Sequence, residues 1–201
     1  MIRATCIQDL PYIYDICLKT GNSGKDATDS FSDKNMLGAF YAAPYIVYSP
    51  QDCFVIIDNG LVSGYILSTV DTNVFYTWLN NEWLPQIRES YKTGFMPKTS
   101  REENMLSTIL KEVELEKSSW IEKYPAHLHI DILEHLQGKG AGRALMTTLF
   151  NHLRKSLVSG IHLGVDKANE NAQGFYKKMG FTVLEEKDWG YVLGYDLTKE
   201  Q

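Results

Sequence analysis

The stretch from Glu134 to Met146, EHLQGKGAGRALM, sets three glycines at every second position between an apolar run and a segment of helical spacing. The run before it, LHIDIL, is typical of a strand. After it, Leu145, Leu149, Leu153 and Leu157 recur every four residues, as on one face of a helix. Glycine inside a helix costs about 1 kcal/mol against alanine. Glycines clustered where a helix begins therefore need a reason other than helix formation.

A strand that runs into a glycine-rich turn and then a helix directs several backbone N–H groups and the positive end of the helix dipole at one point. Such a point binds anions, and glycines keep side chains from holding the anion away from the amides. A plain tight turn needs one glycine, whereas this turn has Gly138, Gly140 and Gly142. The pattern lacks the Gly-Lys-Ser/Thr run of a P-loop. A dinucleotide fingerprint is damaged because Arg143 replaces its third glycine, although Asp166 lies near the ribose-binding distance.

Composition indicates one soluble globular domain spanning residues 1–201, with 44% hydrophobic and 22% charged residues. The net charge of −5 and the pI of about 5.5 disfavour a nucleic-acid partner and make a cationic small molecule or peptide easier to accept. The amino terminus, MIRATCIQDL, has no signal-peptide pattern, and no apolar run is long enough to span a membrane. We therefore expect a cytoplasmic protein.

Periodicity along the chain predicts a mixed α and β protein around one sheet. In the amino-terminal half we expect a short strand at IRATC, a helix from Gln8 to Lys19, a second helix from Lys34 to Tyr41 that ends near Pro44, and a hairpin turning at Asn59-Gly60. Residues 72–124 indicate a helical insertion, in which Ser100 and Glu103 form a predicted capping box. After it we expect the strand, the glycine turn and helix, the strand GIHLGVD, a helix at NAQGFYKKMG and two closing strands.

Two motifs in order resemble those of a known family. Gln137 to Gly142, QGKGAG, fits Q/R-x-x-G-x-G/A, the acetyl-CoA pyrophosphate motif of the GNAT N-acetyltransferases. Asn169 and Ala172, followed by FYKKMGF, resemble that family's N-x-x-A…FYxKxGF signature, about 30 residues further on. The convincing match covers residues 128–181. The pieces DATDSF and YAAPYIV and the aromatic helix further resemble the acetyltransferase-like domain appended to O-GlcNAc hydrolases.

The resemblance implies an α/β/α sandwich on a mixed, mostly antiparallel central sheet, splayed between strands four and five. Acetyl-CoA is then the acyl donor, with its pantetheine arm in the gap and no metal required. The N–H of Ile132 is expected to face the thioester oxygen. The residues implied to bind the donor are Ile132, Leu133, Gln137, Gly138, Lys139, Gly140, Ala141, Gly142, Arg143, Asn169 and Tyr176.

Acyl transfer to an amine needs a base and an acid, because a free alkyl ammonium titrates at about pH 10. Asp131 is our candidate base, since it lies beside the expected thioester contact with its side chain opposite those of its neighbours. A structural hydrogen bond for Asp131, with a water chain as base, remains an equal alternative. Tyr176 stands at the family's tyrosine position, which implies that it returns a proton to the thiolate. Asn169 is either a cofactor contact or a helix cap.

A rival hypothesis comes from the same strand. His127, His129 and Asp131 alternate, so they project from one face with the spacing HxHxD of metal-dependent hydrolases. Ile132 stands where that motif needs a further histidine, and only His135, His152 and His162 remain to complete a site. A third hypothesis is a module that binds acyl-CoA without catalysis. The retained phosphate loop and tyrosine favour an enzyme.

The acceptor side is the part that the motifs leave unassigned. We expect the loop 21–33 and the insertion 72–124 to wall it, around a primary amine carried by a small molecule or a peptide. The aromatic residues of the insertion are expected in the core or in a homodimer interface, with an apolar lid as the alternative: Phe75, Tyr76, Trp78, Trp83 and Tyr91.

Overall fold

One seven-stranded sheet, in the order β1-β2-β3-β4-β5-β7-β6, forms the centre of the protein in a computed structural model that describes residues 1–92 and 94–199. All neighbouring strands are antiparallel except β4 and β5, which are parallel. This is the mixed, mostly antiparallel sheet that the motifs implied. The strands are β1 (Ile2–Ala4), β2 (Phe54–Asp58), β3 (Leu61–Thr69), β4 (Ala126–Ile132), β5 (Gly160–Asp166), β6 (Thr182–Glu186) and β7 (Gly190–Asp196).

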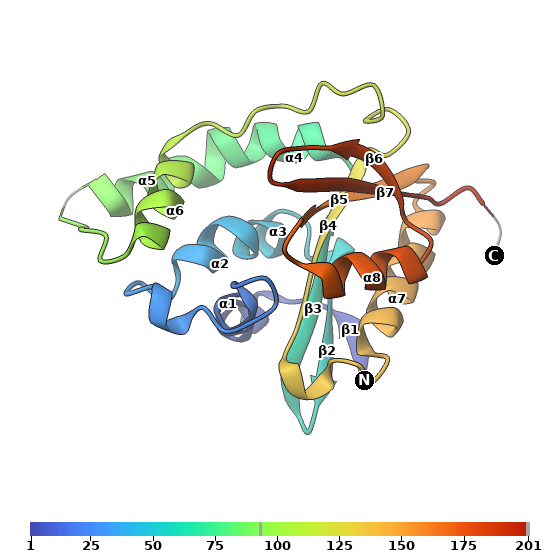
Figure 1. The fold of residues 1–201 in the computed structure, drawn as a ribbon, viewed down its shortest axis with the longest axis horizontal. Helices are drawn as coiled ribbons and strands as arrows, with labels where there is room; N and C mark the ends of the chain where they lie inside the picture. The colour runs from blue at the N-terminus through green and yellow to red at the C-terminus, as the bar shows by residue number, and fades with distance from the viewer. Residues whose placement is uncertain (93, 200–201) are drawn as a thin grey trace.

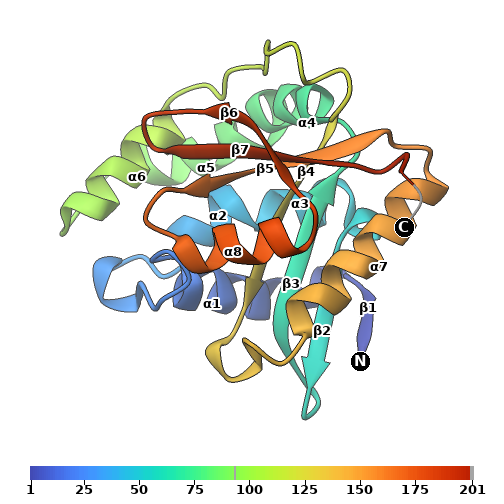
Figure 2. The same cartoon turned by 45° about the vertical axis from the view of Figure 1, so that its right-hand side comes forward.

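Helices cover both faces of the sheet, as Figures 1 and 2 show. One face carries α1 to α6 and the other carries α7 and α8, each over its own hydrophobic core. No helix within residues 1–92 and 94–199 has both the length and the apolar character needed to cross a membrane. The helices are α1 (Leu10–Thr20), α2 (Met36–Tyr41), α3 (Ala43–Tyr48), α4 (Thr72–Trp78), α5 (Leu84–Lys92), α6 (Ser100–Leu110), α7 (Ala141–Lys155) and α8 (Glu170–Lys178).

The amino-terminal half follows its local signals with one exception. Asn59 and Gly60 have φ of 48° and 81°, as a tight two-residue hairpin turn requires. The predicted second helix ends at Tyr41, as expected, but Pro44 lies in the first turn of a further helix, α3. Proline is tolerated there, since the first N–H groups of a helix have no intrahelical partner. The same residue thus opens a helix that the sequence pattern did not predict.

The insertion is helical, as expected, but its cap differs by one residue. Thr99, and not Ser100, is the N-cap of α6, and its hydroxyl accepts the N–H of Glu102. The predicted capping box of Ser100 and Glu103 is therefore wrong. The aromatic residues of the insertion belong to the core on the α1–α6 face, where Phe75 is 1% exposed and the others pack against it.

The helix after the glycine turn is shorter than the leucine spacing suggested. Leu145, Leu149 and Leu153 of α7 are fully buried against the sheet. Leu157 lies beyond the end of α7, with a φ of 59° and 91% of its surface exposed. The repeat therefore marks the buried face of α7 only as far as Leu153.

The sheet is splayed between β4 and β5. These strands pair only at Ala126 with Ile161 and at His127 with His162, whereas β4 pairs with β3 from His127 to Ile132. In Figures 1 and 2, β3 and β4 run steeply while β5 and β7 cross the view. The edge of β4 that faces β5 has no strand partner beyond His127. The predicted gap between the fourth and fifth strands is confirmed.

Candidate functional site

The glycine turn presents a group of backbone donors at the start of α7. Gly138 and Gly140 have φ of 70° and 86°, which lets the chain reverse between the end of β4 and the helix. The N–H of Gln137 donates to Glu134 O and that of Lys139 to Leu136 O, so these two amides are used within the turn. Across the described residues, no protein acceptor lies opposite the remaining amides, which are those of Gly138, Gly140, Ala141, Gly142 and Arg143.

The three glycines of the turn differ in how much room surrounds them. A Cβ added to Gly138 or Gly140 would meet nothing within 4 Å, so these positions are open. A Cβ on Gly142 would come within 3.1 Å of the Phe175 ring, so that glycine lets α8 pack against α7. Two of the three glycines thus provide the backbone turn and an open approach to the amides. Helix polarity adds positive potential at the same point.

The unpaired edge of β4 runs from the gap between β4 and β5 to the glycine turn before α7. Leu133 N–H donates to Ser63 O of β3 at 3.0 Å, so by strand alternation the N–H of Ile132 faces away from β3, into the gap. The carbonyl of Ile132 accepts a hydrogen bond from Gln137 Nε2 at 2.9 Å. The side chain of Gln137 therefore ties the turn to the strand end, and Ile132 offers its N–H to the opening.

Asp131 and Tyr176 lie close to the gap. The carboxylate of Asp131 accepts the Tyr65 hydroxyl at 2.6 Å. Burial raises the pKa of Asp131, against the lowering effect of hydrogen bonds from Tyr65 and Thr20. Tyr176 of α8 is 8% exposed, and burial together with the nearby charge of Asp131 raises its pKa. The charge of Asp131 on β4 thus acts on Tyr176, which belongs to the core under α7 and α8.

Tyr65 is a site residue that the sequence did not reveal. Its ring is 1% exposed, and its hydroxyl is the hydrogen-bond partner of Asp131. Tyr65 and Asp131 are paired across β3 and β4, so the contact depends on strand register. Nothing local to either strand specifies that register, and no motif includes Tyr65.

Asn169 caps α8. Its side-chain oxygen accepts the N–H of Ala172 at 3.1 Å, which satisfies one of the unpaired donors in the first turn of the helix. Of the two roles expected for Asn169, the structure contains the helix cap. Asn169 thereby fixes the start of the helix that carries Tyr176.

The alternating histidines share one face of β4, as predicted, and their rings are engaged with side chains of the core. Thr72 Oγ1 donates to Pro125 O and so accepts from His127 Nδ1, which leaves His127 Nε2 to accept the Tyr45 hydroxyl. Burial lowers the pKa of His127 well below its usual value and that of His129 to about 4. Both ring nitrogens of His127 are therefore occupied, and both rings are neutral near pH 7.

The other histidines are dispersed over the fold. His135 lies 3.4 Å from a carboxylate oxygen of Asp58 and His152 lies 2.6 Å from one of Asp52, while His162 is hydrogen-bonded to a backbone carbonyl. Within residues 1–92 and 94–199, no three His, Cys, Asp or Glu side chains are grouped as metal ligands.

Comparison with known proteins agrees with this geometry. The model of the Acetyltransferase (GNAT) family matches residues 108–181. The crystal structure of SsHAT is 32% identical, covers 99% of this chain and 98% of its own, and superposes with a TM-score of 0.85. A putative acetyltransferase from Salmonella typhimurium, solved with acetyl-CoA, shares the fold at 17% identity and a TM-score of 0.56, covering 100% of this chain and 95% of its own.

Protein O-GlcNAcase of Rattus norvegicus is 23% identical over 180 residues, which are 89% of this chain. The chain spans 20% of the length of that curated relative. The likeness therefore concerns one region of a longer protein, as the sequence resemblance suggested. With an open glycine turn, a splayed sheet and a solved relative that is 32% identical over 99% of this chain, the chain belongs to the GNAT acetyltransferase family.

Proposed function

We propose that the protein transfers the acetyl group of acetyl-CoA to a primary amine of a small molecule or peptide. The observation that carries this proposal is the set of unpartnered amides at the start of α7, beside the unpaired edge of β4. Diphosphate oxygens fit such donors, and the side chains of Lys139 and Arg143 add positive charge nearby. The expectations of cytoplasmic action and of a homodimer stay predictions.

The chemistry of the proposal is a direct attack. The amine nitrogen forms a bond to the thioester carbon, the carbon–sulfur bond breaks, and the sulfur leaves as a thiolate. Ile132 N–H is placed to stabilise the oxyanion that develops at the carbonyl oxygen. Asp131, or a water held by it, takes the proton that the amine loses. Tyr176, whose phenol is protonated near pH 7, supplies a proton to the thiolate.

The test compares wild type with Tyr176→Phe in a thiol-release assay with acetyl-CoA and a library of amines. We expect kcat to fall at least about a hundredfold in the variant, the range typical of lost acid–base catalysis. Thermal stabilisation by acetyl-CoA should be retained, because the amides of the turn are unchanged. Tyr191→Phe is a matched control, since its ring packs against the same core and lies beside Lys167.

Two outcomes would contradict the proposal. Equal turnover in wild type and Tyr176→Phe would remove Tyr176 from the mechanism. Stabilisation by acetyl-CoA without turnover of any amine would favour a module that binds acyl-CoA without catalysis. Metal analysis of purified protein tests the hydrolase hypothesis separately, and a stoichiometric bound metal would revive it.

A further inference from the structure

Trp189 is an exposed aromatic residue in the turn that joins β6 to β7. It is 53% exposed, although its indole lies over Gly164 of β5. A Cβ added to Gly164 would come within 2.8 Å of the indole. A Cβ added to the next residue of the turn, Gly190, would meet Val165 O at 2.1 Å. Two glycines therefore let the turn approach β5 and let the indole lie on the strand.

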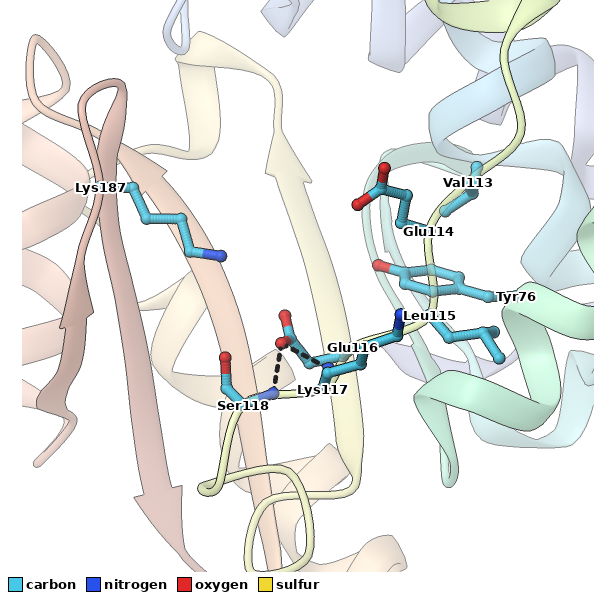
Figure 3. Close-up of a pocket in the computed structure, with 8 residues that line it drawn as sticks. All are labelled: Tyr76, Val113, Glu114, Leu115, Glu116, Lys117, Ser118 and Lys187. Carbon is cyan, nitrogen blue, oxygen red and sulfur yellow. Dashed lines mark hydrogen bonds between the residues drawn. The ribbon is translucent and has the colours of Figure 1, made fainter.

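Backbone hydrogen bonds fix the turn that carries Trp189. Lys167 N–H, at the end of β5, donates to Trp189 O at 3.2 Å. Lys187 and Gly190 exchange backbone hydrogen bonds across the turn at 2.8 and 3.3 Å. The side chain of Lys187 points towards Glu116 of the insertion, across a hollow of about 560 Å³ (Figure 3). The indole therefore has a defined position although its surface is exposed.

The indole of Trp189 is not used to hold the protein together. Trp83 and Trp120 donate their indole N–H groups to Ala39 O and to the carboxylate of Glu185. In the parts of the chain that the structure describes, no acceptor lies opposite the indole N–H of Trp189. Tryptophan is mostly buried in proteins, and an exposed ring with a free N–H can contact a ligand through both.

Trp189 lies on the face of the sheet from which Asp131 projects. His127 is hydrogen-bonded to side chains of α3 and α4, so it belongs to the α1–α6 face, and its ring lies 5.7 Å from that of His162 on β5. Strand alternation places Asp131 on the same face as His127, and Gly164 on the same face as His162. The indole over Gly164 is therefore on this face too.

The residues of this face beside the gap are accessible to solvent. β4 changes from buried to partly exposed at His129, two residues after its last pairing with β5. On β5, Gly164 and Asp166 are exposed. Gly164 and Asp131 lie two and four residues beyond the last paired positions, so their offset along the strands is roughly 7 Å. The indole of Trp189 thus lies across the gap from the expected base, on the same face.

We propose that Trp189 is a specificity-determining residue of the acceptor site, and that its indole packs against the apolar part of the acceptor beside the amine that is acetylated. The inference rests on the proposed function and adds to it how the site selects among amines. Each methylene group that the ring fully covers contributes up to about fourfold in affinity. Trp189 carries no titratable proton, so it takes no part in the proton transfers.

The test measures kcat/KM at saturating acetyl-CoA for each amine that turns over, with ethylamine, butylamine and hexylamine as a matched series. We expect Trp189→Ala to lower the value about tenfold for hexylamine and less than about twofold for ethylamine, because the shorter chain covers little of the ring. The pH dependence of kcat/KM should keep its shape. Trp189→Phe should retain part of the preference, and Gly164→Ala should weaken the preference because it displaces the indole.

Asp188→Ala is the matched control, since Asp188 is the exposed neighbour of Trp189 in the same turn. An equal loss for all amines in Trp189→Ala, or no loss for any, would overturn the inference and leave amine acetylation intact. If the wild type acetylates no amine, the proposed function fails instead. Equilibrium dialysis of hexylamine with CoA-saturated wild type and Trp189→Ala then decides: binding that depends on Trp189 supports the inference, whereas equal binding or no binding overturns it.

Discussion

Asp131 and Tyr176 show how burial can prepare two residues for opposite tasks. Burial disfavours the charged form of each, so it raises both pKa values. For Tyr176 the consequence is a phenol that stays protonated and is a weaker acid than an exposed tyrosine, so its proton must move as negative charge develops on the leaving sulfur. For Asp131 the consequence is a carboxylate of higher basicity than an exposed one. The hydrogen bond from Tyr65 limits the second effect and holds the carboxylate at the gap.

Asp131→Asn should lower kcat/KM about a hundredfold or more if Asp131 is the base. The amine substrate titrates in the same way in assays of both proteins. The informative quantity is therefore the ratio of the wild-type kcat/KM to that of the variant at each pH. Because the carboxylate must be ionised to act, this ratio should fall as the pH drops through the pKa of Asp131, which lies above the usual value of about 4. A small ratio of kcat/KM that does not change with pH would indicate that a water chain, and not Asp131, accepts the proton of the amine.

At the scale of elements, α6 and the loop 21–33 are joined by one buried carboxylate. Glu102 is 0% exposed and accepts the N–H of Ser32, the Ser32 hydroxyl at 2.7 Å, Asp33 N–H at 3.2 Å and Lys98 N–H at 2.7 Å. Burial alone would raise the pKa of Glu102, but these hydrogen bonds outweigh it and lower the pKa to about 2. The insertion thereby fixes the loop that is expected to wall the acceptor side.

Glu102→Gln should destabilise the protein by about 2 kcal/mol near neutral pH, because its amide N–H₂ faces backbone donors. The folded-state pKa is depressed, so the contribution of Glu102 is complete above the unfolded pKa and disappears as the pH falls towards about 2. Urea unfolding of wild type and variant at several pH values measures this difference. Glu103→Gln, at an exposed carboxylate, is the control. An equal loss of unfolding free energy in both variants would contradict the role of Glu102.

Sequence reasoning was most successful where an element is specified locally. The hairpin at Asn59-Gly60 and the glycine turn before α7 each depend on a few adjacent residues. Helix α3 was missed because Pro44 is as suitable for the first turn of a helix as for a helix end. The contacts of Asp131 with Tyr65 and of Glu102 with Ser32 link residues far apart in the chain, so no local pattern contains them.

At the scale of the whole molecule, the splayed sheet brings these parts together. β4 pairs with β3 from His127 to Ile132, and β5 pairs with β7 along its whole length. Strand pairing is therefore incomplete along the edge between β4 and β5, where the two halves of the sheet meet. The core under α7 and α8 contains residues of both halves, such as Ile66 and Leu128 on one side of the gap and Leu163 and Leu193 on the other, so it joins the two halves across the splay. The fold could be predicted because two motifs in order identified the family, whereas composition indicated only a mixed globular domain.

The most direct test of the proposal that the glycine turn binds phosphate is a two-dimensional ¹H–¹⁵N NMR titration with CoA, repeated with pantetheine, which lacks the diphosphate. We expect CoA to shift the amide signals of Gly138, Gly140 and Gly142 strongly, and pantetheine to shift signals near Ile132 while leaving the glycines in place. Binding of CoA that leaves those glycine amides unmoved would contradict an anion site at the start of α7.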